Sequence, residues 1–349
     1  MRRTPYRRSR GGAVAGRADS RGSDTTDRRN KQGPGQGPGR EPGHACGLFS
    51  LAELAPPQIM SLAMRSVELF HDHGAHDRPL AGQLTGLLFT RASTRTRTAF
   101  TAAAIRLGSA PVAFGPADLH LGTGESVGDT GRVLGAVLDS LVARTAGPLD
   151  ELRELSRQGR MPVVNALTAQ EHPTQGLCDL ATLALSFGDL TGIRVLYLGE
   201  GNSTAVALAH ALAAVPGSRV TFATPAGYGM PQEELRTADR RAGTVGASVD
   251  QIHDLAAAPP DVDVLYTTRW QLAGIARPDP AWREAFRPFH VDEALLDRWP
   301  RAAFMHGLPA RRGDEVSGRV LDGPRSLAWT QAAMKPAGAM AVLEWAAAR

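Results

Sequence analysis

The stretch that decides the fold of this chain is Leu84-Thr85-Gly86-Leu87-Leu88-Phe89, followed after a short turn by Ser93-Thr94-Arg95-Thr96-Arg97. The apolar run is typical of a buried strand, and the residues after it open a segment that suits a helix. A helix that starts just after a strand leaves unpaired N–H groups at its first turn, where its dipole favours negative charge. Hydroxyls and two guanidiniums add further donors. The stretch therefore predicts a site for a phosphate dianion, although an N-cap followed by an exposed arginine face is the plainer alternative.

A second polar segment also predicts a binding site. His172-Pro173-Thr174-Gln175 follows the apolar run at 161–166 and precedes a helical pattern from Gly176 to Ser186. Proline at the first helical position fixes the entry of the helix, so His172 and Gln175 are expected to project from one turn at the mouth of a sheet. Histidine can donate to a carbonyl oxygen, and the glutamine amide suits a ligand that presents NH2 and C=O side by side.

A third segment, Phe304-Met305-His306-Gly307-Leu308-Pro309, reads as another short strand that runs into a turn. Its backbone carbonyls can accept hydrogen bonds from an NH2 group. Alone this segment indicates little about function, and it supports a binding site only together with the other two segments.

The apolar runs alternate with helical segments along the whole chain, which predicts an α/β fold of two doubly wound parallel-sheet domains. The first domain is expected over 47–187 and the second over 188–327. All candidate site residues fall at or just after the carboxyl ends of strands, where open α/β sheets bind ligands. The expected strands are Gln83-Phe89, Ala110-Phe114, Ser140-Arg144 and Pro162-Ala166 in the first domain, and Arg194-Leu198, Arg219-Thr224, Ala247-Ile252, Asp263-Thr268 and Ala302-His306 in the second.

Residues 1–46 are expected to form a disordered basic tail. Residues 1–42 hold ten arginines and Lys31 against four acidic side chains, a net charge of +7, which leaves −3 for the rest of a chain whose total is +4. The tail has few aliphatic residues and cannot bury enough surface to offset the entropy of ordering it. Its glycines and prolines argue against an amphipathic presequence. A basic arm can also bind nucleic acid, but a disordered extension or a misassigned start codon is the preferred interpretation.

Composition sets the remaining bounds. A chain of 349 residues with 42% hydrophobic content can build two domains of ordinary size. No apolar run approaches the length of a membrane span. Cys46 and Cys178 lie far apart and show no metal or redox spacing, so we expect a cytoplasmic protein with no metal and no cofactor.

The order and spacing of the three polar segments resemble the aspartate/ornithine carbamoyltransferase family, from about Leu48 to the C-terminus. Three further stretches add to the resemblance. His120–Ser126 looks like the family's swinging loop, Leu141–Arg144 like the strand that delivers a second phosphate-binding arginine, and Gly199–Asn202 like the start of the acceptor domain.

The resemblance implies a carbamoyl-phosphate-binding first domain, a second domain for the amine acceptor, and a helix, Ala332–Ala348 within 328–349, that returns to the first domain. Family members are typically trimers with shared active sites, so a homotrimer is expected. The implied catalytic residues are Arg95, Thr96, Arg144, His172 and Gln175. Carbamoyl phosphate would be held by Ser93, Thr94, Arg95, Thr96, Arg144, His172, Gln175, Leu308 and Lys335, with His120 from a neighbouring subunit, and the acceptor by Asn202, Thr268, Arg269, Gln271 and Gly307.

The acceptor segments depart from both branches of the family. Ornithine enzymes carry D-x-W-x-S-M-G and H-C-L-P, whereas this chain reads Thr268-Arg269-Trp270-Gln271-Leu272-Ala273-Gly274 and His306-Gly307-Leu308-Pro309. The T-R-x-Q part fits aspartate enzymes, but their H-P-L-P and a further arginine are missing. Lys335 stands where ornithine enzymes have an arginine. Gly307, Leu272 and Ala273 replace polar or bulky groups, which predicts a wider acceptor pocket.

These departures lead to the hypothesis of a carbamoyltransferase that acts on an unusual amine, such as a diamino acid or a peptide side-chain amine, as in the formation of ureido groups during antibiotic biosynthesis. The alternatives are an ornithine or aspartate carbamoyltransferase and a catalytically silent regulatory relative. A nicotinamide cofactor is disfavoured, because Thr204 stands where a dinucleotide motif has its third glycine and Thr224 where it has an acidic residue.

Overall fold

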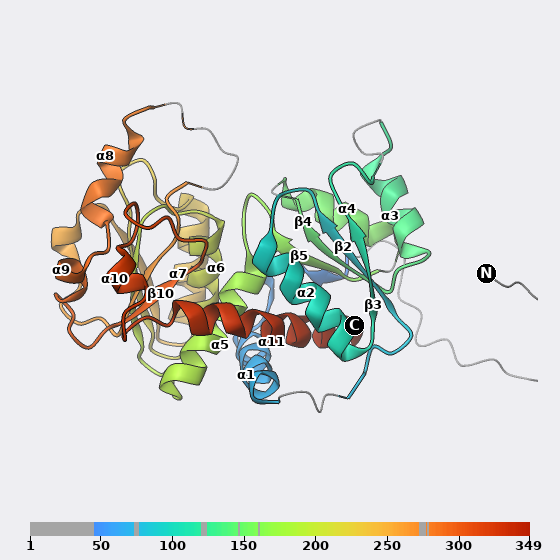
Figure 1. The fold of residues 1–349 in the computed structure, drawn as a ribbon, viewed down its shortest axis with the longest axis horizontal. Helices are drawn as coiled ribbons and strands as arrows, with labels where there is room; N and C mark the ends of the chain where they lie inside the picture. The colour runs from blue at the N-terminus through green and yellow to red at the C-terminus, as the bar shows by residue number, and fades with distance from the viewer. Residues whose placement is uncertain are drawn as a thin grey trace, which may run out of the picture. The chain divides into compact units, whose positions relative to one another are not determined.

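Two five-stranded parallel sheets carry the fold (Figure 1). The computed structural model describes residues 45–72, 77–119, 124–145, 147–159, 161–271, 277 and 279–349. Both sheets belong to one compact unit, Glu41–Arg349. The first sheet has the order β1-β5-β4-β2-β3 and the second β10-β9-β6-β7-β8. The strands are β1 Gly47–Leu48, β2 Leu84–Phe89, β3 Ala110–Phe114, β4 Ser140–Arg144, β5 Val163–Leu167, β6 Arg194–Leu198, β7 Arg219–Ala223, β8 Ser248–Ile252, β9 Val264–Thr267 and β10 Ala303–His306.

Helices cover both faces of each sheet. They are α1 Pro56–His71, α2 Thr94–Leu107, α3 Val127–Gly135, α4 Leu149–Gly159, α5 Pro173–Phe187, α6 Ser203–Leu212, α7 Gln232–Gly243, α8 Trp282–Phe286, α9 Glu293–Leu296, α10 Gly318–Leu321 and α11 Ala328–Ala347. Side chains alternate between the faces of β4: Val142 joins the core beneath α1, α2, α5 and α11, while Leu141 and Ala143 join the core beneath α3 and α4. Both faces of the central strands are therefore buried, which is why most of their positions are apolar.

One hydrophobic core runs from the first sheet to the second. It includes Val142 and Val164 on one side and Tyr197 and Tyr266 on the other, with α5 and α6 packed between them. Tyr197 and Tyr266 stack with ring centroids 5.7 Å apart. The two sheets are therefore joined by buried packing rather than by a flexible link.

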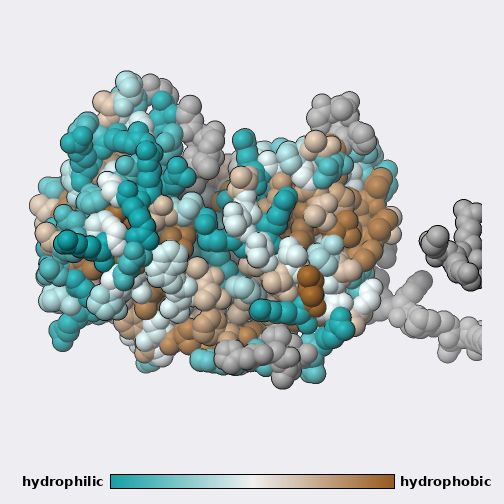
Figure 2. All heavy atoms as spheres, viewed as in Figure 1, coloured by the Kyte–Doolittle hydropathy of each residue, from teal (hydrophilic) through white to brown (hydrophobic). Residues whose placement is uncertain are grey.

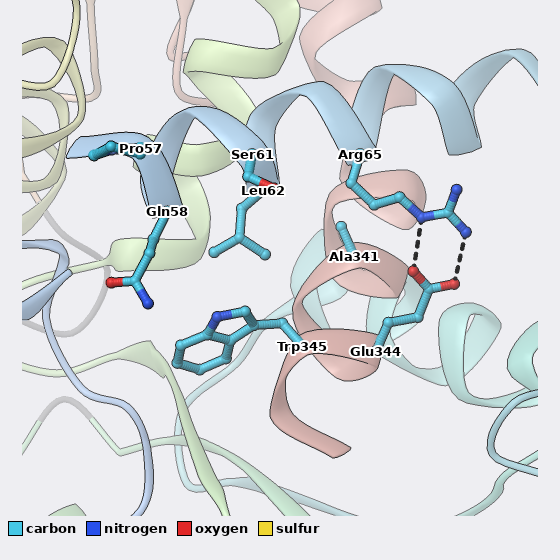
Figure 3. Close-up of a pocket in the computed structure, with 8 residues that line it drawn as sticks. All are labelled: Pro57, Gln58, Ser61, Leu62, Arg65, Ala341, Glu344 and Trp345. Atoms are coloured by element: carbon cyan, nitrogen blue, oxygen red, sulfur yellow. Dashed lines mark hydrogen bonds and ion pairs between the residues drawn. The ribbon is translucent and has the colours of Figure 1, made fainter. Parts of the chain in front are cut away.

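The long helix α11 packs against α1, α2 and α5 and also contacts β10. Figure 3 shows the outer seam between α1 and α11, where Arg65 and Glu344 form a double hydrogen bond of 2.8 and 3.0 Å. Beside this pair lies an open groove of about 520 Å³ next to Trp345. No helix in the described part of the chain is long and apolar enough to cross a membrane.

The predicted strands are all present within one or two residues of their expected bounds, and all pair in parallel. Sequence reasoning missed β1, a two-residue strand that adds an edge to the first sheet beside β5. The helix expected from Ala332 begins four residues earlier, at Ala328. The domain boundaries at 187 and 327 stay predictions.

The expected tail lies outside the described residues as far as residue 44. Its predicted end at residue 46 is too late, because Cys46 bonds through its backbone N–H and its carbonyl to the Ser156 hydroxyl, both at 2.7 Å. Cys46 therefore belongs to the folded part of the chain.

Candidate functional site

Both sheets reverse their strand order next to the predicted site. In the first sheet, β3 and β4 lie on opposite sides of β2, and in the second, β7 and β9 lie on opposite sides of β6. Ligands in open α/β sheets bind outside the carboxyl ends of the strands at such a reversal. Ser93 follows β2, Arg144 ends β4, Asn202 follows β6 and Thr268 follows β9. The topology therefore brings the two halves of the predicted site to the two reversal points.

A cavity of about 300 Å³ joins these points. It contains thirteen of the predicted site residues. Gln271 does not line it, and His120 lies outside the described residues. Four lining residues were not predicted; they sit at the ends of strands or beside predicted ones and carry no charge that would have marked them. The lining residues are Ala92, Ser93, Thr94, Arg95, Thr96, Arg144, Leu167, His172, Gln175, Asn202, Thr204, Thr268, Arg269, Gly307, Leu308, Pro309 and Lys335.

The start of α2 presents donors to the cavity. Ser93 is the N-cap residue, and its hydroxyl makes no capping hydrogen bond. Thr96 is buried, and Arg95 is half-buried with its pKa lowered by desolvation. Burial, together with the charge of Arg95, lowers the pKa of Arg144 to about 10. Two cations that disfavour each other and are poorly solvated are stabilised by an anion placed between them.

Arg97 does not take part in this arrangement. The motif predicted that both of its guanidiniums bind the phosphate, but Arg97 is exposed, lies 5.3 Å above the ring of Phe89 and does not line the cavity. Residues two positions apart on a helix face different directions, so Arg95 and Arg97 cannot both point inward. The second guanidinium of the cradle comes from Arg144 instead.

His172 is buried and neutral. Its pKa is lowered well below the usual value by desolvation, and also by the charges of Arg144 and Lys335. Its Nε2 lies 3.4 Å from Nη1 of Arg144, and its Nδ1 lies 3.3 Å from the hydroxyl of Thr174. Arginine can only donate, so Nε2 is the acceptor in this contact and the proton sits on Nδ1. The ring can donate to a ligand only after its proton moves to Nε2.

Gln175 and Lys335 meet at the floor of the cavity. The ammonium of Lys335, from α11, donates to Oε1 of Gln175, and Nε2 of Gln175 donates to Oδ1 of Asp179 at 2.6 Å. Desolvation lowers the pKa of Lys335, and the charges of Arg95 and Arg144 act in the same direction. Sequence reasoning missed Asp179, which follows the H-P-x-Q motif by one helical turn.

The turn after β10 is held by a buried His–Glu pair. Nε2 of His306 lies 3.2 Å from Oε1 of Glu315, and its Nδ1 accepts the backbone N–H of Leu308 at 2.8 Å. Leu308 adopts φ 31°, in the left-handed region, and precedes a cis proline. The hydrogen bond from its N–H fixes this uncommon backbone conformation at the edge of the cavity.

On the acceptor side, the amide of Asn202 is already engaged. Its Oδ1 caps α6 by accepting from the N–H of Thr204 at 3.0 Å, and its Nδ2 donates to the hydroxyl of Thr268 at 3.2 Å. Tyr197 contacts the same hydroxyl at 2.9 Å. The predicted acceptor residues Asn202 and Thr268 therefore hold each other in place as well as lining the cavity.

Gly307 does not open extra space at its own Cα. A β-carbon built there would lie 3.1 Å from Cγ2 of Thr268 and from the hydroxyl oxygen of Tyr266, and 3.6 Å from Cγ2 of Thr204. Neighbouring methyl and hydroxyl groups would crowd a side chain at this position, and the expectation that the glycine widens the pocket stays a prediction. Leu272 and Ala273 lie outside the described residues.

The charge of the cavity is one-sided. Among the described lining residues, Arg95, Arg144, Arg269 and Lys335 carry positive charge and none carries a carboxylate. The described residues also contain no group of three or more histidine, cysteine and acidic side chains that could hold a metal ion. The cavity suits a ligand with a concentrated negative charge.

Comparisons with known proteins find relatives along most of this chain. The family "Aspartate/ornithine carbamoyltransferase, carbamoyl-P binding domain" matches residues 47–184, and "Aspartate/ornithine carbamoyltransferase, Asp/Orn binding domain" matches residues 191–346. The ornithine carbamoyltransferase of Pyrococcus abyssi is 34% identical over 288 residues, covering 82% of this chain and 90% of that protein. That of Gloeobacter violaceus is 36% identical over 286 residues, with 82% and 90% covered.

The fold has solved counterparts. Ornithine carbamoyltransferase from Pyrococcus furiosus superposes with a TM-score of 0.80 at 32% identity, covering 86% of this chain and 96% of that structure. The Gloeobacter violaceus structure gives 0.76 at 34% identity, with 86% and 98% covered. The chain belongs to the aspartate/ornithine carbamoyltransferase family and is a carbamoyltransferase.

Proposed function

We propose that this enzyme transfers the carbamoyl group of carbamoyl phosphate to an amine other than free ornithine, giving a ureido product and phosphate. The observation that carries the proposal is the contrast between the two ends of one cavity. The donor end keeps its predicted cations, whereas the acceptor end offers Arg269 and, among the described lining residues, no carboxylate.

The phosphate of the donor would bind at the start of α2, between Arg95 and Arg144, with the hydroxyls of Ser93, Thr94 and Thr96 as further donors. This region combines the N–H groups of a helix start with two poorly solvated guanidiniums. The NH2 of the carbamoyl group would then face Oε1 of Gln175 and the backbone carbonyl of Leu308, both at the cavity wall.

The reaction is an attack by a neutral amine on the carbamoyl carbon, which builds negative charge on the carbonyl oxygen. Thr96 and Arg144 would donate to this oxygen, and His172 would join them once Nε2 carries its proton. Each fixed donor of this kind is typically worth about 3 kcal/mol of transition-state stabilisation. The departing phosphate can accept the proton of the amine, so the mechanism requires no separate general base.

The acceptor end points to an amine whose far end is anionic or uncharged. Free ornithine brings an α-ammonium group, which would lie at the acceptor end with Arg269, where no described lining residue carries a carboxylate to balance it. A side-chain amine on a peptide lacks that charge, because its α-nitrogen is acylated. Amines of this kind are substrates for ureido-group formation in natural-product assembly, and we assign the enzyme to that class of reaction.

The decisive experiment measures kcat/KM with labelled carbamoyl phosphate and a panel of amines. The panel should hold ornithine, aspartate, diaminopropionate and short peptides with a side-chain amine, and labelled ureas should be identified by mass. We expect efficient turnover only with a member other than ornithine and aspartate. An ordinary kcat/KM for either of them, about 10⁴ M⁻¹ s⁻¹ or more, would sink the proposal and favour the activity named for the relatives.

We further propose a cytoplasmic homotrimer in which His120 of one subunit reaches the phosphate site of the next. Exposed apolar side chains on the first-sheet half support an association surface: Ile105 on α2, Val133 on α3 and Val137 just after it are each more than half exposed. Figure 2 shows hydrophobic residues gathered on the side of the view where Figure 1 places β3 and α3. Exposed apolar area of this kind is typical of an interface.

A further inference from the structure

A closed network of buried polar groups lies directly beneath the cavity. Its centre is Asp179, on α5, whose side chain is completely buried. Oδ1 of Asp179 accepts from Nε2 of Gln175 at 2.6 Å and from Nε2 of Gln331, and Oδ2 accepts from the hydroxyl of Tyr266 at 2.9 Å. Three donors from α5, α11 and β9 therefore meet on one carboxylate.

This arrangement permits only one orientation of the Gln175 amide. Lys335 can only donate, and an ionised Asp179 can only accept. With Oε1 towards Lys335 and Nε2 towards Asp179, both contacts are hydrogen bonds. In the reversed orientation, NH2 would face an ammonium and the amide oxygen would face a carboxylate, so two attractive contacts would become two repulsive ones.

The orientation decides which ligand group the cavity accepts. Oε1 of Gln175 has a second lone pair, and Gln175 lines the cavity. With Asp179 ionised, the amide presents an acceptor, which pairs with an NH2 group and not with a carbonyl oxygen or a methyl group. A carbamoyl group is thereby distinguished from an acetyl group of nearly the same size.

The network also reaches the other predicted contact of the NH2 group. Gln331 uses its Oε1 to accept the backbone N–H of His306 at 3.1 Å, and His306 in turn fixes the N–H of Leu308. Tyr266 comes from β9 of the second sheet. Asp179 therefore ties the amide of Gln175 and the turn at Leu308 to one buried carboxylate.

We propose that Asp179 is a positioning residue that sets the orientation of the Gln175 amide and so gives the donor site its preference for a carbamoyl over an acetyl group. The inference rests on the proposed binding mode of carbamoyl phosphate. Asp179 is not among the residues that line the cavity, so it would act on the ligand through Gln175.

The test compares carbamoyl phosphate with acetyl phosphate, which carries CH3 in place of NH2 and the same phosphate end. Dissociation constants of both ligands are measured by calorimetry for the wild type, Asp179→Asn and Thr182→Val. Thr182 is a completely buried polar residue on the same helix whose hydroxyl donates to the carbonyl of Cys178 at 2.7 Å, and it serves as the matched control. We expect Asp179→Asn to reduce the preference for carbamoyl phosphate at least tenfold and Thr182→Val to leave it unchanged.

Equal weakening of both ligands in Asp179→Asn, or an unchanged ratio, would overturn the inference, because a purely structural role affects both ligands alike. A wild type that binds neither phosphate compound would overturn the proposed binding mode itself, and the inference with it. KM for the amine acceptor should change less than KM for carbamoyl phosphate in Asp179→Asn.

A second measurement needs no variant and covers the case in which Asp179→Asn does not fold. Burial raises the pKa of Asp179 to about 6. The titratable groups that face it are Lys335 on α11, Tyr266 on β9, Tyr197 on β6 and Cys178 on α5. The thiol and both phenols have raised pKa values and stay neutral below pH 8, and Lys335 only gains charge as the pH falls.

Protonated Asp179 becomes a donor as well as an acceptor, so the reversed amide is no longer repelled by Asp179, and only the ammonium of Lys335 still opposes it. The wild-type preference for carbamoyl over acetyl phosphate should therefore fall between pH 8 and pH 5. The ratio cancels the titration that the two phosphate groups share. A ratio that stays constant across this range contradicts the inference.

Discussion

Arg95 and Arg97 stand two positions apart on α2 and have different surroundings. Arg95 lines the cavity, and Arg97 stacks on Phe89 in solvent. Lysine keeps the charge of arginine and loses the fork that bonds two phosphate oxygens. We expect Arg95→Lys to lower kcat/KM for carbamoyl phosphate about 100-fold, in line with the loss of one fixed donor. Arg97→Lys, the matched control, should change kcat/KM less than twofold. Similar losses in steady-state assays of the two variants would contradict the assignment.

The titration of Asp179 also has a consequence for stability. Its pKa is about 6 in the folded protein and about 3.9 in an unfolded chain, so the folded state binds this proton more tightly. Its contribution to the free energy of unfolding is therefore present below about pH 4 and is lost as the pH rises through 6. The loss amounts to about 3 kcal/mol.

Urea unfolding of the wild type and of Asp179→Asn between pH 4 and 7.5 measures the contribution of Asp179 to the free energy of unfolding. The free energy of unfolding of the wild type minus that of the variant should fall with rising pH, because only the wild type carries the group. A difference that rises with pH would mean that the carboxylate is stabilised in the folded state, contrary to its burial.

At the residue scale, the sequence predicted which side chains belong to the site better than it predicted where those side chains point. The donor residues were identified by motif, and all that the structure describes line one cavity. Arg97 was misplaced, because a motif does not state the phase of its helix. The crowding around Gly307 could not be predicted, because the three side chains that cause it come from β9, the turn after β9 and α6. Asp179 was missed, because its role depends on partners on other elements.

Two glycines on different helices give opposite predictions for helix packing. A β-carbon on Gly176 would lie 2.6 Å from the carbonyl oxygen of Ala207, where α5 crosses α6, whereas one on Gly338 of α11 would meet only ordinary contacts at 3.9 Å or more. Gly176→Ala should lower the free energy of unfolding by about 2 kcal/mol through overpacking. Gly338→Ala should raise it by up to about 1 kcal/mol through helix propensity.

Urea unfolding of both variants under the same conditions checks the pair. The backbone of Ala207 cannot move away without shifting α6. The expected destabilisation by Gly176→Ala is therefore the more decisive of the two predictions. A Gly176→Ala protein as stable as the wild type would show that the two helices are packed less closely than described.

At the element scale, continuous apolar runs were enough to predict parallel strands buried on both faces. Strand β1 was not predicted, because two residues form no recognisable pattern. It forms by pairing with the edge of β5. The start of α11 at Ala328 was also not predicted. Ala328 is buried by tertiary packing, and no strong capping residue marks the position in the sequence.

The expected sharing of active sites can be tested on the whole assembly. His120→Ala and Arg95→Ala chains are inactive alone if both residues are needed at each site. In a randomly mixed cyclic oligomer, about a quarter of the sites would combine an intact Arg95 with an intact His120 from the neighbour. We therefore expect partial recovery of turnover after the two variants are unfolded together and refolded.

Two different affinity tags should be used to prove that mixed oligomers form. Homogeneous refolding of each variant is the control for recovery by other routes. Persistent inactivity in proven mixed oligomers would count against shared sites and against the role proposed for His120.

The position of α11 has a consequence for how the protein is made. This helix packs against α1, α2 and α5 and supplies Lys335, which bonds to a glutamine 160 positions earlier. A nascent chain that has completed the first sheet thus still exposes the apolar surface that α11 will cover, and its donor pocket still lacks a cation. The donor pocket is therefore complete only after α11 has been synthesised and has packed onto the first sheet's helices.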